Sequence, residues 1–290
     1  MAAEAFFLPA AHGQRLCIHH AAAGGRARGA VLYLHPWAEE MNKARRMAAL
    51  QARALAEAGH AVLQVDLHGC GDSSDTWAEA SWTGWVDDAV LAAQWLVARY
   101  PAAAQGQLWL WGLRAGALVA VQAAARLAPR CHFLFWQPAS SGRVLLQQFL
   151  RLKGAAELQG DAKGVIDAAR RGLAAGQVQH IAGYPLSPAL AQGLEQAALT
   201  PPPEQPGHAP GRVVWLELST RLEATLLPAS TPRVDEWRAA GHAVQTQVVA
   251  GPAFWQTVEI EDAPALISAS LAALSDQTEA QPRAMAEPLS

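Results

Sequence analysis

Cysteine, charged residues and long hydrophobic runs are all scarce in this sequence of 290 residues. Its three cysteines, Cys17, Cys70 and Cys131, are far apart and have no paired or metal-type spacing. This argues against a disulfide framework or a zinc site and favours a reducing compartment. No stretch reaches the roughly 18 uncharged apolar residues that a membrane-spanning helix needs. The N-terminus lacks the basic start and sustained apolar core of a signal peptide, so we expect a cytoplasmic protein.

The charge balance limits the classes of partner. Charged residues make up only 16% of the sequence and the net charge is −3, with no long basic run. The chain therefore has no electrostatic footprint for nucleic acid or an anionic membrane. Hydrophobic residues make up 51%, which predicts a sizeable core rather than disorder. Tryptophan is abundant at eleven residues, and this side chain lines pockets as well as cores.

Strand-like apolar runs alternate with helical stretches along most of the chain. Strands are expected at Ala5–Leu8, Arg15–His20, Ala30–Leu34, His60–Val65, Gln107–Trp111, Cys131–Trp136, Arg212–Leu218 and Ala243–Ala250. Helices are expected at about Lys43–Ala58, Trp82–Arg99, 115–127, Pro232–Ala240 and in a closing stretch to about Leu274. Strands that are apolar throughout are typical of a parallel sheet covered on both faces. We therefore predict an α/β fold with a mostly parallel, doubly wound sheet.

The periodicity weakens after the fourth buried strand and resumes only beyond a cluster of prolines at 201–206. We interpret residues 139–210 as a helical cap insertion that packs over the edge of the sheet. The core then comprises residues 1–138 and 211–275. Residues 276–290 are small, polar and proline-containing, which predicts a flexible tail.

A strand that breaks into G-x-x-x-G and continues as a helix is the pattern of a nucleophile elbow. Here the motif is Gly112-Leu113-Arg114-Ala115-Gly116. Its glycines leave room for a very tight turn, which pushes the central side chain out over the sheet. The central residue is Arg114, where a working hydrolase of this type carries serine. A guanidinium stays protonated and cannot attack a carbonyl carbon.

Two further motifs at strand ends support the same fold. Residues 32–37 (LYLHPW) look like the strand and His-Gly stretch that supplies one oxyanion donor, with Pro36 in the usual place of glycine. Residues 65–73 (VDLHGCGDS) resemble the D-x-x-G-x-G-x-S turn that follows the next strand in these hydrolases. Three such elements in the right order indicate the α/β-hydrolase fold.

The combination LHPWAEEMNKARR, DLHGCGDS, LWGLRAGA and GPAFWQTVEIE resembles the exosortase A system-associated hydrolases, type 2. The resemblance runs from about Phe6 to Leu274 and is weakest in the cap. It implies a role in bacterial exopolysaccharide and PEP-CTERM sorting systems, beside acyl-activating enzymes and acyl carrier proteins. The family was named from its fold, so the name itself says little about activity.

A Ser-His-Asp mechanism needs a base and an acid as well as a nucleophile. The base normally follows the last strand as a Gly-His pair, but that loop reads Gly251-Pro252-Ala253-Phe254-Trp255, and no histidine occurs after His242. Glu217 and Glu223 are available for the acid, but without a base neither is informative. Two of the three roles are vacant, so ordinary triad catalysis is not expected.

Other candidate residues favour structural interpretations. Cys70 lies in a turn that tolerates small residues, and His35 occupies a position where the fold keeps a histidine for loop architecture. His68 is a further possible base. Ser140 and Ser141 follow a strand end without an obvious base, which favours helix capping. Three tryptophans at strand ends are candidates for a pocket floor: Trp37, Trp136 and Trp255.

Arg114 at a helix N-terminus needs an anion, because the helix end is already positive and stripping a guanidinium of water is unfavourable. The preferred interpretation is an internal, bidentate pair with Glu39 or Glu40, since a permanently unpaired arginine is expensive. The alternative is a carboxylate or phosphate of a ligand. We expect a small-molecule acyl or anionic ligand, with acyl carrier protein or a CoA ester as candidates, and no cofactor or metal.

Two other functional hypotheses stay open. The chain could be a hydrolase, thioesterase or acyltransferase with a non-standard site, in which Arg114 stabilises an oxyanion together with the backbone N–H groups of Trp37 and Ala115. It could also be a structural partner of the related type 1 hydrolase, with its own pocket filled.

Overall fold

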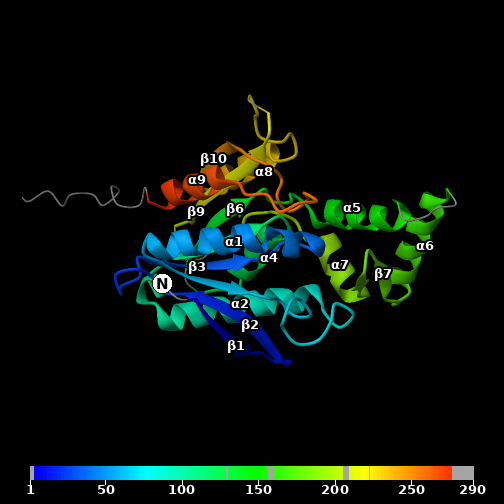
Figure 1. Cartoon of the computed structure of the whole chain (residues 1–290), viewed down its shortest axis with the longest axis horizontal. Coiled ribbons are helices and arrows are strands. Elements are labelled where there is room, and N and C mark those ends of the chain that lie inside the picture. The colour runs from blue at the N-terminus through cyan, green and yellow to red at the C-terminus, as the bar shows by residue number, and fades with distance from the viewer. Residues whose placement is uncertain (1–2, 129, 156–159, 205–208, 222, 276–290) are drawn as a thin grey trace, which may run out of the picture.

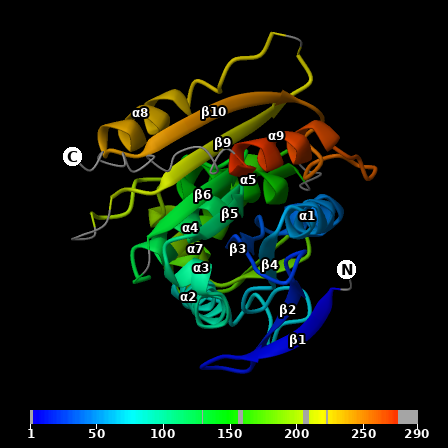
Figure 2. The same cartoon turned by 90° about the vertical axis from the view of Figure 1, so that its left-hand side faces the viewer.

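The computed structural model describes residues 3–128, 130–155, 160–204, 209–221 and 223–275. An eight-stranded sheet runs through its centre in the order β1-β2-β4-β3-β5-β6-β9-β10 (Figure 2). Its strands are β1 (Glu4–Pro9), β2 (Gln14–His20), β3 (Gly29–Leu34), β4 (His60–Val65), β5 (Leu108–Leu113), β6 (Cys131–Trp136), β9 (Arg212–Ser219) and β10 (Ala243–Ala250). All neighbouring pairs from β4 to β10 are parallel, whereas β1 and β2 pair antiparallel at one edge. The predicted mostly parallel sheet is confirmed.

Helices cover both faces of this sheet, as the apolar strands require (Figure 2). On one face, α1 (Glu39–Glu57) and α9 (Pro264–Ser275) contribute to a core that includes Trp109, Trp111 and Trp136. On the other face, α2 (Trp82–Arg99), α4 (Ala115–Ala124) and α8 (Thr231–Ala239) bury their apolar residues against the same strands. A single turn, α3 (Pro101–Ala104), leads from α2 into β5.

The strand order reverses direction between β3 and β5. From β3 the chain moves through α1 to β4 on one side, and it then crosses through α2 to β5 on the other side. Leu34 at the end of β3 is the register partner of Gly112 in β5, so the loops that follow both strands start side by side. In open α/β sheets, the carboxyl edge at such a switch point is where ligands bind.

The segment between β6 and β9 forms its own group of elements at one end of the molecule (Figure 1). It comprises α5 (Gly142–Ala155), α6 (Ala162–Ala174), β7 (Gln179–Ile181), β8 (Tyr184–Leu186) and α7 (Pro188–Gln196). The β7–β8 hairpin was not predicted from the sequence. Its two-residue turn, Ala182-Gly183, has positive φ at both positions, as a primed hairpin turn needs. The division into a core and a cap at 139–210 stays a prediction.

Two helix boundaries differ from expectation. Helix α1 begins at Glu39 rather than near Lys43, directly after Ala38 with φ 51°. Helix α4 ends at Ala124, before the predicted Leu127. The predicted flexible tail, 276–290, lies outside the described residues. In the described part of the chain, no helix is both long and apolar enough to cross a bilayer.

Candidate functional site

The turn between β5 and α4 has the geometry of a nucleophile elbow. Arg114 adopts φ 55° and ψ −113°, a conformation that L-residues rarely occupy. A Cβ added to Gly112 would come within 2.5 Å of the Ala117 Cα, and one added to Gly116 would collide with the Leu34 carbonyl oxygen. Only glycine fits at these two positions, which is why the motif has this spacing.

Backbone hydrogen bonds hold the elbow to the end of β6. The Arg114 N–H donates to the Trp136 carbonyl at 3.1 Å, and the Arg114 carbonyl accepts from the Ala139 N–H at 3.2 Å. Both bonds bridge segments that the sheet already places side by side. The unusual backbone of Arg114 is therefore fixed from two directions.

The Arg114 side chain lies against the N-terminus of α1. Its Nε is 3.3 Å from Oε1 of Glu40, and the two side chains are only 14% and 11% exposed. The amide of Gln256 reaches the same Glu40 oxygen at 3.5 Å, and the guanidinium lies 5.9 Å from the centre of the Trp255 ring. Sequence analysis missed Gln256, although it lies in the motif GPAFWQTVEIE and directly follows Trp255.

The contact differs from the bidentate pair that the sequence suggested. Arg114 approaches Glu40 through Nε alone, and Glu40 Oε2 is buried without a hydrogen-bond partner among the described residues. Burial raises the pKa of Glu40, and the nearby Arg114 limits that rise. Glu39 makes no ion pair with Arg114 in the described structure, and its Oε2 is likewise buried without a partner.

His35 is fully occupied by the loop that follows β3. Its Nδ1 lies 2.9 Å from the Pro36 carbonyl, and its Nε2 accepts the Leu67 N–H at 3.2 Å. Burial lowers the pKa of this imidazole. A neutral ring that donates from Nδ1 and accepts at Nε2 satisfies both bonds, so His35 ties the β3 and β4 loops together and has no free nitrogen to act as a base.

Trp37 and Ala115 occupy the two positions considered for oxyanion donors. Ala115 is the first residue of α4, where a backbone N–H has no acceptor within the helix. Trp37 is 4% exposed, and its ring packs against Trp77, Trp85 and Phe149. Its indole Nε1 is buried without a hydrogen-bond partner in the described part of the chain.

The loop after β10 carries no base. It runs through Pro252 to Phe254 and Trp255, both of which are buried. The nine described histidines are engaged or placed elsewhere. They are His12 in the β1–β2 turn, His19 and His20 in β2, His35 and His68 in the β3 and β4 loops, His60 in β4, His132 in β6, His180 in β7 and His242 before β10.

Glu217, a candidate for the catalytic acid, is hydrogen-bonded to other groups of the fold. Glu217 is buried in β9, where Oε1 accepts the Trp215 indole N–H at 3.0 Å and Oε2 accepts the Leu227 N–H at 2.7 Å. Both oxygens therefore bind groups of the fold itself. Glu223 is exposed.

The remaining candidate residues make contacts within the fold or lie next to a helix start. Burial raises the pKa of the Cys70 thiol far above its ordinary value, and Cys70 Sγ accepts the Trp77 indole N–H at 3.2 Å. His68 Nε2 lies 2.8 Å from Asp75 Oδ2. Ser140 and Ser141 directly precede α5. The described residues contain no group of three His, Cys, Asp or Glu side chains that could hold a metal ion.

Trp136 does not line the elbow, contrary to the expectation for strand-end tryptophans. Its indole N–H donates to the Oγ of Ser270 at 2.9 Å, and Ser270 belongs to α9. A side chain at the end of a strand points to one face of the sheet or the other, and here it points into the core with α9. Of the three tryptophans, Trp255 is the one whose ring lies near the Arg114 guanidinium, whereas Trp136 meets Arg114 through its backbone carbonyl.

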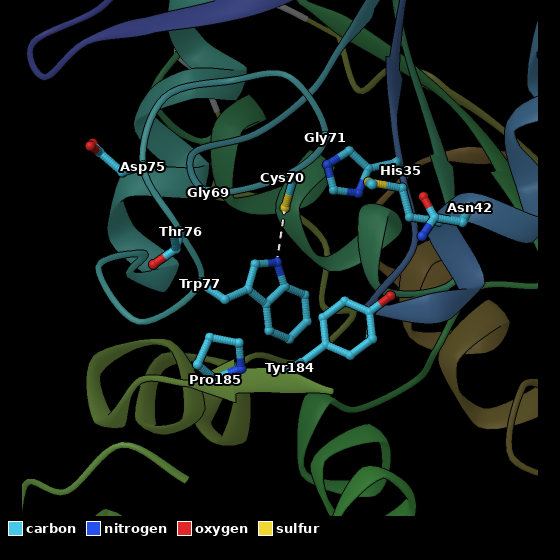
Figure 3. A pocket seen from close by; sticks show the side chains of 12 residues that line it. His35, Asn42, Gly69, Cys70, Gly71, Asp75, Thr76, Trp77, Tyr184 and Pro185 are labelled. Carbon is cyan, nitrogen blue, oxygen red and sulfur yellow. Dashed lines mark hydrogen bonds between the residues drawn. The ribbon is translucent and has the colours of Figure 1, made fainter. Parts of the chain in front are cut away.

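A pocket of about 350 Å³ is lined in part by the loop that follows β3 (Figure 3). The backbone of the same loop lies against Gly116 of the elbow. The β3 loop and α1 contribute His35, Ala38, Met41 and Asn42, and the β4 loop contributes Gly69 to Gly71 and Asp75 to Trp77. Tyr184 and Pro185, on the β7–β8 hairpin, close it from below in this view. Sequence analysis missed Asn42 and Tyr184, because no motif in the sequence marks this hairpin.

Comparison with known proteins identifies the fold. Residues 25–158 match the family described as serine aminopeptidase, S33. No curated protein matches the chain by sequence. Among solved structures, the chain is similar to XC6422 from Xanthomonas campestris, described as an α/β serine hydrolase without lid, with 16% identity, 97% of each chain covered and a TM-score of 0.55.

Two further structures agree. Est1E from Butyrivibrio proteoclasticus with ferulic acid bound has 14% identity, with 94% of this chain and 98% of that chain covered and a TM-score of 0.60. DcsB in complex with its substrate analogue has 14% identity, with 95% and 99% covered and a TM-score of 0.58. The chain has the α/β-hydrolase fold, as the three motifs predicted.

Proposed function

We propose that this α/β-hydrolase-fold protein binds an acyl or anionic ligand as an accessory protein and does not carry out Ser-His-Asp hydrolysis. The observation that carries the proposal is the Arg114–Glu40 contact at the elbow, where a nucleophile would stand. A guanidinium cannot attack a carbonyl carbon, and no imidazole follows β10 among the described residues. A role in bacterial exopolysaccharide and PEP-CTERM systems is supported by the sequence resemblance alone, and a cytoplasmic location is supported by the free cysteines.

The polar groups at the elbow suit an anion that competes with Glu40. Arg114 offers further N–H groups beyond the Nε that faces Glu40, and α4 begins at the next residue with its positive end directed at the same place. Glu40 then acts as an internal substitute for the ligand carboxylate or phosphate. An acyl group linked to CoA or to an acyl carrier protein carries phosphate groups that could bind to Arg114 in place of Glu40, together with an apolar chain.

Activity assays test the first half of the proposal. The purified protein is incubated with short-chain p-nitrophenyl esters and with a fluorophosphonate probe, beside the Arg114→Ser and Arg114→Ala variants. We expect no turnover and no labelling by the wild type or by Arg114→Ser, because a serine without a base stays unreactive. Turnover that disappears in Arg114→Ala would instead support the rival enzyme, in which Arg114 stabilises an oxyanion.

Ligand binding tests the second half. We expect CoA esters or acyl carrier protein to raise the thermal midpoint of the wild type and to lose this effect in Arg114→Ala. Glu40→Gln removes the internal competitor and should strengthen binding about tenfold, whereas the neighbouring Glu39→Gln is the matched control and should change little. No response of any variant to either ligand would contradict the proposal and leave a purely structural partner.

A further inference from the structure

Backbone strain is concentrated around the elbow and the neighbouring pocket. Five non-glycine residues of the described structure have clearly positive φ: Ala38, Asp75, Arg114, Gln137 and Ala182. Arg114 is the central residue of the elbow, and Gln137 follows β6, the neighbouring strand. Ala38 and Asp75 line the pocket, and Ala182 lies in the turn that leads to Tyr184. Such backbone conformations are unfavourable for residues with a Cβ, and strain of this kind clusters at ligand sites.

Most polar side chains in the pocket wall are already engaged by the protein. His35 uses both ring nitrogens, Cys70 accepts from Trp77, Asp75 pairs with His68 at 2.8 Å and the Thr76 hydroxyl donates to Glu79 at 3.1 Å. The Asn42 amide and the Tyr184 hydroxyl face each other, and neither side chain bonds to another group among the described residues. Figure 3 shows the Tyr184 hydroxyl directed to the side where Asn42 lies.

The remaining wall is apolar and aromatic. The rings of Trp77 and Tyr184 lie 4.8 Å apart at 48°, and Met41 and Pro185 extend this surface. Trp77 is held from behind by Trp37 and by its bond to Cys70, so its ring has a fixed position. A ring packed against fixed aromatic surfaces is stabilised beyond the effect of its buried area, because edge-to-face and offset-stacked contacts are favourable.

The charges of the lining disfavour an anionic ligand at this place. Asp75 is the one carboxylate or basic side chain of the lining apart from His35, and it is paired with His68. The His35 imidazole is buried with its pKa lowered, so it supplies no positive charge. An anion would therefore enter without a counterion, and the one carboxylate that a cation could meet in the lining already lies 2.8 Å from His68 Nε2.

We propose that this pocket binds an uncharged aromatic ring that carries one carbonyl or hydroxyl group. The ring packs on Trp77 and Tyr184, and its polar group bonds to the Asn42 amide and the Tyr184 hydroxyl. A volume of about 350 Å³ lies near the lower end of small-molecule sites, which suits a single ring with a short substituent. The proposal rests on the proposed function only in assigning a ligand to this end of the fold.

Titration calorimetry of the full chain with three probes tests it. Acetanilide is a neutral aromatic amide, benzoate is an anion of similar size and hexanamide has an acyl chain in place of the ring. We expect acetanilide to bind most tightly. Asn42→Leu should weaken its binding about tenfold, which corresponds to about 1.4 kcal/mol, and Tyr184→Phe about threefold. Asn42 is exposed, so its substitution leaves the fold intact, as an unchanged thermal midpoint verifies.

Each contrary result has a definite meaning. Failure of acetanilide to bind, or equal binding by Asn42→Leu, overturns the site. Tighter binding of benzoate or of hexanamide overturns the ligand class. Arg114→Gln should bind acetanilide as the wild type does, whereas Arg114 substitution removes ligand binding under the proposed function. Labelling of the wild type by fluorophosphonate would therefore contradict the proposed accessory role and leave the proposal for this pocket unchanged.

Discussion

Arg114 and Glu40 meet across the elbow through one nitrogen and one oxygen, 3.3 Å apart and almost removed from water. Replacing Arg114 by methionine leaves a buried carboxyl group without its cation, and this should lower the free energy of unfolding by about 3 kcal/mol at pH 8. Glu40→Gln in the same background should recover much of that loss. A double-mutant cycle by urea denaturation measures the coupling, and additive effects of the two substitutions would contradict it.

The same pair predicts a pH dependence. Burial already raises the pKa of Glu40 above its ordinary 4.5, and loss of Arg114 raises it further. The folded protein then holds a proton that the unfolded chain releases, so the free energy of unfolding falls as the pH rises above 4.5. We expect Arg114→Met to be less destabilising at pH 5 than at pH 8. An equal loss at both pH values would show that Glu40 is not the partner that matters.

The elbow glycines give a prediction about packing. An alanine at Gly116 would place its Cβ against the carbonyl oxygen of Leu34, so Gly116→Ala should destabilise the fold by about 3 kcal/mol. Gly25 is the control, because it has φ +79° but no atom within 4 Å of an added Cβ. Gly25→Ala should cost only about 1 kcal/mol, from backbone strain alone. Equal losses in denaturant midpoint would mean that the close approach at Gly116 is relieved without cost.

Two buried histidines make the fold sensitive to acid. Burial lowers the pKa of His60 to about 4 and that of His132 to about 3, from 6.5 in each case. The unfolded chain therefore binds protons below pH 6.5 that the folded chain refuses, and the free energy of unfolding should fall by about 1.4 kcal/mol per pH unit for each histidine. Urea titrations at pH 7.5, 6 and 5 measure this slope. His60→Leu should make the slope shallower, and an unchanged slope would assign the acid sensitivity to other groups.

Glu217 is expected to matter for stability and not for ligand chemistry. In Glu217→Gln only one oxygen remains to accept, so either the Trp215 indole or the Leu227 amide loses its partner. We expect a loss of about 2 kcal/mol in thermal or urea unfolding, while the exposed Glu223→Gln stays neutral. Acetanilide and CoA-ester binding should be unchanged in both variants. Altered binding in Glu217→Gln alone would give this carboxylate a functional role.

The sequence was most informative where local pattern and tertiary environment agree. The strands β4, β6 and β10 begin and end at the predicted residues. For β4 and β6, mainly apolar runs between turn signals leave little choice of structure. Helix α2 likewise begins at Trp82, directly after the Ser81 side chain that accepts the Gly84 N–H. The G-x-x-x-G spacing predicted the elbow because a Cβ at either glycine would collide with backbone atoms next to the turn.

Long-range contacts were not predictable in the same way. Glu39 and Glu40 are adjacent and chemically identical, and only the start of α1 after the left-handed Ala38 determines which one meets Arg114. Trp136 could face either side of the sheet, and its bond to Ser270 was set by α9, more than a hundred residues later. The pocket depends on the β7–β8 hairpin, whose short strands give too weak a pattern to recognise.

Gly116 of the elbow packs so closely against the loop that follows β3 that no Cβ fits between them. The carbonyl groups of Leu34 and His35 lie against Gly116 at the start of α4. The side chain of His35 forms part of the pocket wall. The backbone of His35 thus borders the elbow, and its side chain borders the pocket. A substitution of His35 should disturb both places, whereas a change confined to the Arg114 side chain should leave the pocket as it is.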